Sequence, residues 1–176
     1  MLEPAHDTMP AAHSRFTPIN NDRTIGEQWN ADGTVLAFDF GEKRIGVAVG
    51  EHLLGIAHPL TTIAAEANDQ RFRQIAALIE EWRPALLLVG LPVFADGTEH
   101  ELTALSRKFA RRLDGRFGLP VGMVDERYTS AQASQSLAET GIRGRKQKPM
   151  LDQVAAQHIL QTYFDSVSRK PSHDPA

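Results

Sequence analysis

The chain contains no cysteine, which excludes disulfide bonds and thiolate metal sites. Any metal ion held by its own side chains must therefore have oxygen or imidazole ligands. Long apolar runs are also missing, because the longest aliphatic run, residues 85–89, is far too short to span a bilayer. The first residues show neither the basic nor the apolar region of a secretory signal, so we expect a cytoplasmic protein with no membrane partner.

An excess of positive charge is missing as well. The sequence has 19 Lys and Arg against 22 Asp and Glu, and its formal net charge of −3 does not by itself indicate nucleic-acid binding. The distribution of charge matters more than its sum. Basic residues cluster at 107–116 and at 143–148, so a local contact with a polyanion stays open.

The length of 176 residues suits one domain with a sizeable core. Residues 1–33 mix Pro, Asn, Asp, His and Thr without periodicity, which predicts a disordered extension. The globular domain then covers residues 34–166, and residues 167–176 form a disordered tail.

Hydrophobic patterning predicts alternating strands and helices after residue 33. We expect strands at 34–40, 45–50, 52–57, 85–89 and 120–124, and helices at 67–82, 98–117, 130–139 and 150–165. The first two strands form an antiparallel hairpin through a short turn. This order predicts an α/β fold with a mixed sheet and flanking helices. A flavodoxin-like sheet also fits the alternation, but the initial hairpin favours the RNase H-like arrangement.

One carboxylate, Asp39, stands inside the apolar run 34–40, which is typical of a strand buried on both faces. An isolated ionised carboxylate there is costly unless a cation or hydrogen bonds compensate it. Two interpretations stay open. A divalent metal ion compensates Asp39, or Lys43 or Arg44 pairs with it across the turn.

A second carboxylate, Asp152, stands at the head of an apolar helical stripe. It shares one helix face with Ala155, Ala156, Ile159, Leu160 and Tyr163. That face turns inward, where a carboxylate is out of place. The alternative is an acidic residue in the first helical turn after Pro149, where the helix dipole favours it by about 0.3–1 kcal/mol.

Four segments resemble, in the same order, the motifs of the YqgF family. They are FDFG with RIGVA at 38–48, GLP with DGT at 90–98, VDERYTS at 124–130 and RGRKQKPMLDQVAA at 143–156. YqgF proteins are RNase H-fold nucleases related to Holliday-junction resolvases and associated with maturation of the 5′ end of 16S ribosomal RNA. The resemblance implies a metal-dependent nuclease that uses Mg²⁺ or Mn²⁺ and acts on pre-16S rRNA or a pre-ribosomal particle.

Carried over by motif, the resemblance implies that Asp39, Glu126 and Asp152 are the catalytic residues and the metal ligands. Mg²⁺ prefers such hard oxygen ligands. Two ions about 3.5–4 Å apart can stabilise both the attacking and the leaving oxygen of phosphodiester cleavage. Asp125 and Glu126 are adjacent, so at most one of them faces the site if the strand pleat continues.

Nucleic acid should contact the basic loop that precedes Asp152. Its candidate residues are Arg143, Arg145, Lys146 and Lys148, and Arg44 and Thr98 are added from the other motifs. The backbone amides of the 90–98 loop could also hold phosphate. The alternatives are a solvated loop for the charge run and an ordinary strand–helix turn at 90–98.

Other functions stay open. Resolution of four-way DNA junctions is the same chemistry on branched DNA, and a non-catalytic RNA-binding module is a further alternative. The segment 39–48 also resembles the first phosphate loop of actin-like ATPases, but the remaining length cannot supply their second lobe. The sequence does not indicate an oligomeric state.

Overall fold

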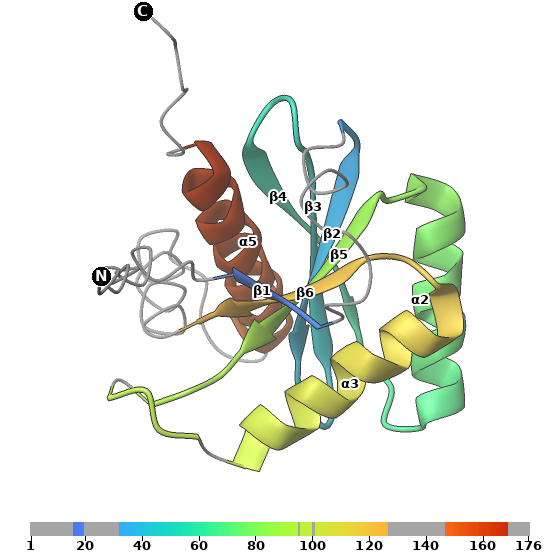
Figure 1. Ribbon diagram of the computed structural model, residues 1–176. Helices are drawn as coiled ribbons and strands as arrows, with labels where there is room; N and C mark the ends of the chain where they lie inside the picture. The colour runs from blue at the N-terminus through green and yellow to red at the C-terminus, as the bar shows by residue number, and fades with distance from the viewer. Residues whose placement is uncertain (1–15, 20–31, 95, 100, 127–146, 169–176) are drawn as a thin grey trace, which may run out of the picture.

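The computed structural model describes residues 16–19, 32–94, 96–99, 101–126 and 147–168. Within these residues, one sheet carries helices on both of its faces (Figure 1). The strands are β1 (Phe16–Pro18), β2 (Thr34–Phe40), β3 (Ile45–Glu51), β4 (Ile56–Ile63), β5 (Leu86–Leu91) and β6 (Val121–Asp125). The helices are α2 (Asn68–Trp82), α3 (Glu101–Phe117) and α5 (Gln147–Ser168).

The sheet of the described residues has six strands in the order β1-β6-β5-β2-β3-β4. The strands β2, β3 and β4 pair antiparallel, β5 joins β2 and β6 in parallel, and β1 pairs antiparallel with β6. The predicted α/β fold, with a mixed sheet, an antiparallel hairpin formed by β2 and β3, and flanking helices, is confirmed. The parallel strands β2, β5 and β6 all end at the same edge of the sheet.

The two faces of the sheet have separate cores. On β2, Leu36 and Phe38 face α2 and α3, whereas Val35 and Ala37 face α5. Successive side chains of a strand point to opposite faces, so the alternation assigns each later residue of β2 to one of the two layers. Both faces are fully covered here, as predicted for a central strand.

The predicted strand over 52–57 is wrong at both ends, because residues 52–55 form a turn and β4 runs from Ile56 through Ile63, with His58 and Pro59 inside it. A proline inside a strand is tolerated here since β4 lies at the edge of the sheet. The pairing register also shifts between Val47 and Ala48, and Pro59 pairs with Ala48 directly after that shift.

The prediction that residues 1–33 lack structure is wrong for β1. Phe16 pairs with Val124 and Pro18 with Gly122, which covers an edge of β6 that would otherwise be unpaired. At the other end, α5 continues to Ser168, two residues into the predicted tail. The rest of the tail, most of the extension and the predicted helix over 130–139 lie outside the described residues.

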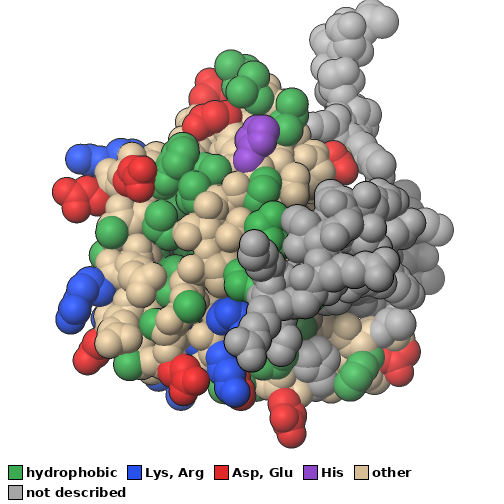
Figure 2. All heavy atoms as spheres, turned by 180° about the vertical axis from the view of Figure 1, so that it is seen from behind, with side chains coloured by type: hydrophobic (Ala, Val, Ile, Leu, Met, Phe, Trp, Pro, Cys, Tyr) green, Lys and Arg blue, Asp and Glu red, His purple; other side chains and the backbone are tan. Residues whose placement is uncertain are grey.

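Exposed apolar side chains mark the turn between β3 and β4. Leu53, Leu54 and Ile56 are all largely exposed, and Figure 2 shows hydrophobic side chains gathered at that end of the molecule. Glu51 pairs with Thr34 at the beginning of β2, so this turn lies at the end of the sheet away from Asp39. In the part of the chain that the structure describes, no helix is long and apolar enough to cross a membrane.

Candidate active site

Asp39 lies near the carboxyl end of β2, on the face that α5 covers. It follows Val35 and Ala37 at the spacing of two that keeps side chains on one face. Its partner across the hairpin is Gly46. A Cβ atom at Gly46 would overlap the backbone carbonyl of Asp152, so α5 approaches β3 more closely than any side chain at position 46 would allow.

This close approach brings two carboxylates together. The pKa of Asp39 is raised to about 7, mainly because burial disfavours its charged form and also because the charge of Asp152 repels it. Asp39 forms no ion pair with any cation of the described residues. A cation placed between the two carboxylates would relieve both penalties.

Arg44 already supplies one positive charge to this pair. Its Nε donates to Oδ2 of Asp152 at 2.7 Å, and both side chains are partly exposed. The sequence left open an ion pair between Lys43 or Arg44 and Asp39. In the described residues Arg44 instead pairs with Asp152, which lies on a helix 108 residues away.

The first turn of α5 is held in place by β4. The hydroxyl of Thr62 donates to the carbonyl oxygen of Pro149 at 2.8 Å, and Nε2 of Gln153 donates to the Thr62 hydroxyl at 3.1 Å. The two bonded residues of α5, Pro149 and Gln153, lie before and after Asp152 in the sequence. Their bonds to Thr62 fix the position of this part of α5 relative to β4. Sequence reasoning missed both bonds, and no local pattern signals them.

Glu126 lies on the same sheet face as Asp39. Val124 faces α5, so the residue two positions later returns to that face, while Asp125 points to the other one. Its carboxylate lies over Gly90 of β5, where an added Cβ would come 2.6 Å from Oε2. Gly90 directly follows Val89, the partner of Phe38, and is therefore level with Asp39.

The structure thus brings Asp39, Glu126 and Asp152 to one face at the carboxyl edge of the parallel strands. They are not drawn into one cluster, since no three His, Asp or Glu of the described residues are grouped closely enough to hold a metal ion. The donor chemistry nevertheless fits a hard divalent cation, because carboxylate oxygens are its preferred ligands. Asp39, which pairs with no cation of the described residues, is the carboxylate that such an ion would stabilise most.

Most of the predicted nucleic-acid contacts fall outside the described residues, namely Arg143, Arg145 and Lys146. Lys148 lies in the first turn of α5, and its side chain is likewise not described. Thr98 is exposed, and its backbone amide and its hydroxyl donate to Oδ1 of Asp96 at 2.9 and 2.7 Å. This local bonding favours the ordinary strand–helix turn at position 98.

Comparison with known proteins identifies the family. A family model described as RuvX, Holliday junction resolvase, matches residues 33–166. The "Putative pre-16S rRNA nuclease" of Methylobacillus flagellatus is 71% identical over 136 residues, which cover 77% of this chain and 93% of that protein. The protein of the same name from Nitrosomonas europaea is 65% identical over 135 residues, with 77% and 91% covered.

A solved structure, T. thermophilus RuvC in complex with Holliday junction substrate, is 17% identical. The match covers 78% of this chain and 96% of that one, with a TM-score of 0.47. The family model and the two bacterial relatives confirm the resemblance to the YqgF family that the four motifs indicated. The chain belongs to the RuvX family.

Proposed function

We propose that this protein is a metal-dependent endonuclease that hydrolyses phosphodiester bonds during 5′-end maturation of pre-16S ribosomal RNA. The observation that carries the proposal is the position of Asp39, Glu126 and Asp152 on one sheet face at one edge, with Asp39 and Asp152 electrostatically coupled. The nuclease names of the relatives and the family description support it. Maturation of ribosomal RNA takes place in the cytoplasm, which is the location we propose.

Asp39, Glu126 and Asp152 would hold Mg²⁺ or Mn²⁺ in this proposal. When bound, such an ion supplies an activated water and stabilises charge on the departing oxygen. Arg44 is partly exposed beside Asp152 and could also bind a phosphate oxygen of the substrate. The cations of the 143–148 loop would hold the phosphate backbone on the approach to Asp152.

A four-way DNA junction is the second candidate substrate, because the matching family model is described as a resolvase. The same carboxylates would serve either nucleic acid. The two proposals therefore differ in the shape that the surrounding surface accepts and not in the chemistry of cleavage.

A cleavage assay tests these proposals. A labelled RNA carrying the 5′ precursor segment of 16S rRNA and a four-way DNA junction are incubated separately with Mg²⁺, Mn²⁺ or EDTA. We expect metal-dependent cleavage of the RNA, reduced by about 100-fold or more in Asp39→Asn, Glu126→Gln and Asp152→Asn. The matched control is Asp165→Asn, an exposed residue of the same helix as Asp152.

Each result has a distinct meaning. Cleavage of the junction alone would replace the substrate and keep the metal-dependent nuclease. RNA binding without cleavage in either metal would indicate a non-catalytic RNA-binding module. Full activity of the three acid variants would refute the site assignment.

A further inference from the structure

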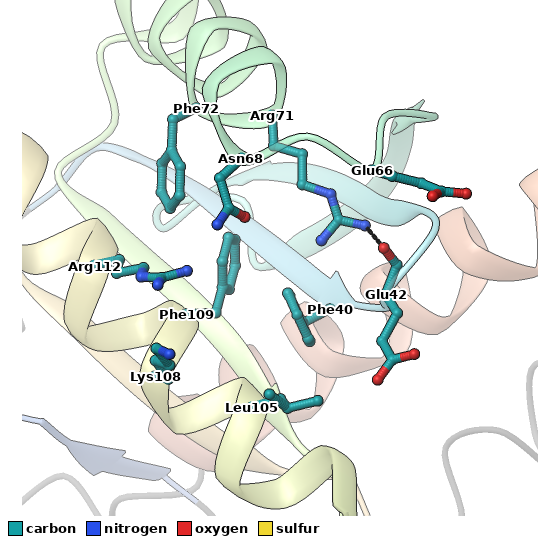
Figure 3. Close-up of a pocket in the computed structure, with 10 residues that line it drawn as sticks. All are labelled: Phe40, Glu42, Glu66, Asn68, Arg71, Phe72, Leu105, Lys108, Phe109 and Arg112. Carbon is teal, nitrogen blue, oxygen red and sulfur yellow. Dashed lines mark hydrogen bonds between the residues drawn. The ribbon is translucent and has the colours of Figure 1, made fainter.

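A cavity of about 290 Å³ lies on the sheet face opposite to Asp39 (Figure 3). It lies between α2, α3 and the turn that follows β2, and Phe40, Phe72 and Phe109 line it. These rings belong to or pack against the core under α2 and α3. The cavity is therefore separated from the candidate active site by the thickness of the sheet. None of the predicted site residues lines it.

The cavity contains a buried cation. Arg71 is only 3% exposed, and its guanidinium lies 5.5 Å from the centre of the Phe40 ring. Its Nε and Nη2 donate to the backbone carbonyls of Ala65 and Glu42. Within the described residues it forms no ion pair, although buried charges are normally paired. Burial accordingly lowers the pKa of Arg71, and Glu66 and Glu42 only partly oppose that effect.

Two further cations lie across the cavity from Arg71. Lys108 and Arg112 are four residues apart on α3, a spacing that puts them on one side of the helix. Figure 3 shows the Asn68 amide and Arg112 directed toward the same space, with Lys108 beside Arg112, whereas the Arg71 guanidinium reaches the Glu42 backbone carbonyl on the other side of Asn68. Glu42 and Glu66 also line the cavity on the side of Arg71, and their carboxylates extend away from Lys108 and Arg112 (Figure 3). The groups that converge are therefore hydrogen-bond donors and positive charges.

The beginning of α2 adds to the positive character of the cavity. Asn68, which lines the cavity, is the first residue of this 15-residue helix, and its N-cap residue Ala67 makes no side-chain capping bond. The positive end of the helix dipole favours an anion there, although Asp69 in the first turn already supplies one negative charge. Arg71 has carbonyl partners but no ion pair among the described residues, so its charge is offset only in part and also favours an anion.

We propose that this cavity is a phosphate site that takes the terminal phosphate monoester of a nucleic-acid strand. A monoester carries close to two negative charges at neutral pH and offers three strong acceptor oxygens, which suits a cavity whose lining has three cations and two carboxylates. The volume lies just below the range of typical small-molecule pockets, so it suits one end group and not a run of strand.

The choice of a nucleic-acid strand as the source of the phosphate rests on the proposed function. Phe40 of the cavity directly follows Asp39, so the two sites lie back to back at the same sheet edge. A strand end held in the cavity could pass around the turn that carries Arg44 and reach the carboxylates. The site would thus anchor the substrate and take no part in the cleavage itself.

Binding measured by fluorescence anisotropy in EDTA tests this inference, because no cleavage is needed. Short RNAs of one sequence are compared with a 5′-phosphate, a 3′-phosphate or hydroxyl ends, and inorganic phosphate and a nucleoside monophosphate serve as competitors. The wild-type protein should bind one phosphorylated end about 10-fold more tightly than the hydroxyl ends. The variant Lys108→Gln/Arg112→Gln should lose that preference.

The control is Arg73→Gln/Arg83→Gln, which removes two exposed cations outside the cavity and should keep the preference. Lys108 and Arg112 are exposed, so thermal unfolding should be nearly unchanged in their variant. Equal affinity for all ends, or a preference that survives in Lys108→Gln/Arg112→Gln, would overturn the inference. Competition by inorganic phosphate without any preference for a strand end would overturn it too, because the site would then take free phosphate.

The two proposals can fail separately. A protein that cleaves RNA without preferring a phosphorylated end keeps the proposed function and refutes this site. A protein that prefers the phosphorylated end but cleaves nothing keeps the site and refutes the nuclease.

Discussion

Arg44 and Asp152 form an ion pair at 2.7 Å that joins the β2–β3 turn to the second turn of α5. The pair lies next to Asp39, whose pKa is raised by burial and by the charge of Asp152. The guanidinium therefore offsets part of the repulsion between two carboxylates that α5 and β2 bring together. A divalent ion bound by the same carboxylates would act in the same direction, so Arg44 and the ion should substitute for one another in part.

Replacing Arg44 with Gln should lower the stability of the metal-free protein by about 1 kcal/mol, because Asp152 loses its cation while Asp39 stays close. Added Mg²⁺ or Mn²⁺ should restore more stability to this variant than to the wild type. Urea unfolding with and without the metal measures both effects. The control is Arg107→Gln, which breaks the more exposed pair of Arg107 with Glu99 and should cost less, without any metal dependence. If the metal raised the stability of the wild type, Arg44→Gln and Arg107→Gln by the same amount, the prediction would be contradicted.

Asp39 should make the metal-free protein less stable as the pH rises. Its folded-state pKa is about 7, whereas an unfolded Asp titrates near about 3.9, so only the folded protein keeps the proton between these values. Stability should therefore fall from about pH 4 to about pH 7, by up to a few kcal/mol.

The variant Asp39→Asn removes this dependence and should be about as stable as the wild type at pH 4 and more stable at pH 8 in EDTA. Urea unfolding at the two pH values is the measurement. Metal-dependent cleavage should be lost in the same variant while the fold is retained. If Asp39→Asn is instead less stable by about 3 kcal/mol or more, Asp39 is held by a cation, and the metal interpretation fails.

Two glycines of the candidate site should not tolerate alanine. At Gly46 the new Cβ meets the backbone of Asp152, which cannot rotate away, whereas at Gly90 it meets the side chains of Ile159 and Glu126. Gly46→Ala should therefore destabilise the protein more than Gly90→Ala, for which we expect about 1–3 kcal/mol. Both variants should also lose cleavage, because each displaces a carboxylate.

Gly115→Ala is the matched control, since a Cβ at that helical position has nothing within 4 Å. It should stabilise the protein by about 0.4–1 kcal/mol. Thermal or urea unfolding measures the stability of the three variants, and we expect the order Gly115→Ala, then Gly90→Ala, then Gly46→Ala from most to least stable. A Gly46→Ala variant as stable as Gly115→Ala would show that α5 does not approach β3 this closely.

Neutralising Arg143, Arg145, Lys146 and Lys148 together should weaken nucleic-acid binding without changing metal affinity. Binding to phosphates carries no sequence information, so the decrease in affinity should be similar for unrelated RNAs. The slope of log affinity against log salt should fall by up to about 0.7 for each phosphate of a single strand that these cations no longer neutralise. An unchanged slope would mean that RNA binds elsewhere, and the basic segment 107–116 would be the next region to test.

Local patterns in the sequence were sufficient to predict the strands and helices that carry the candidate site. The alternation of β2 and the step from Val124 to Glu126 follow from the period of two in a strand. The helical stripe behind Asp152 follows from the period of 3.6, and its buried face is confirmed. These patterns depend only on neighbouring residues. The order of the four motifs in addition indicated the family.

Interactions between distant segments could not be predicted in this way. Two such interactions are the ion pair of Arg44 with Asp152 and the contact of the Glu126 carboxylate with Gly90. Both depend on how α5 and β6 pack against strands that are distant in the sequence. The pairing of β1 with β6 and the burial of Arg71 in its cavity have the same origin. Local periodicity indicated most of the strands and helices and their apolar faces, but not β1 or the extent of β4. Which charges meet depends on the packing of distant segments, because strand register and helix packing are set by the whole core and by no local period.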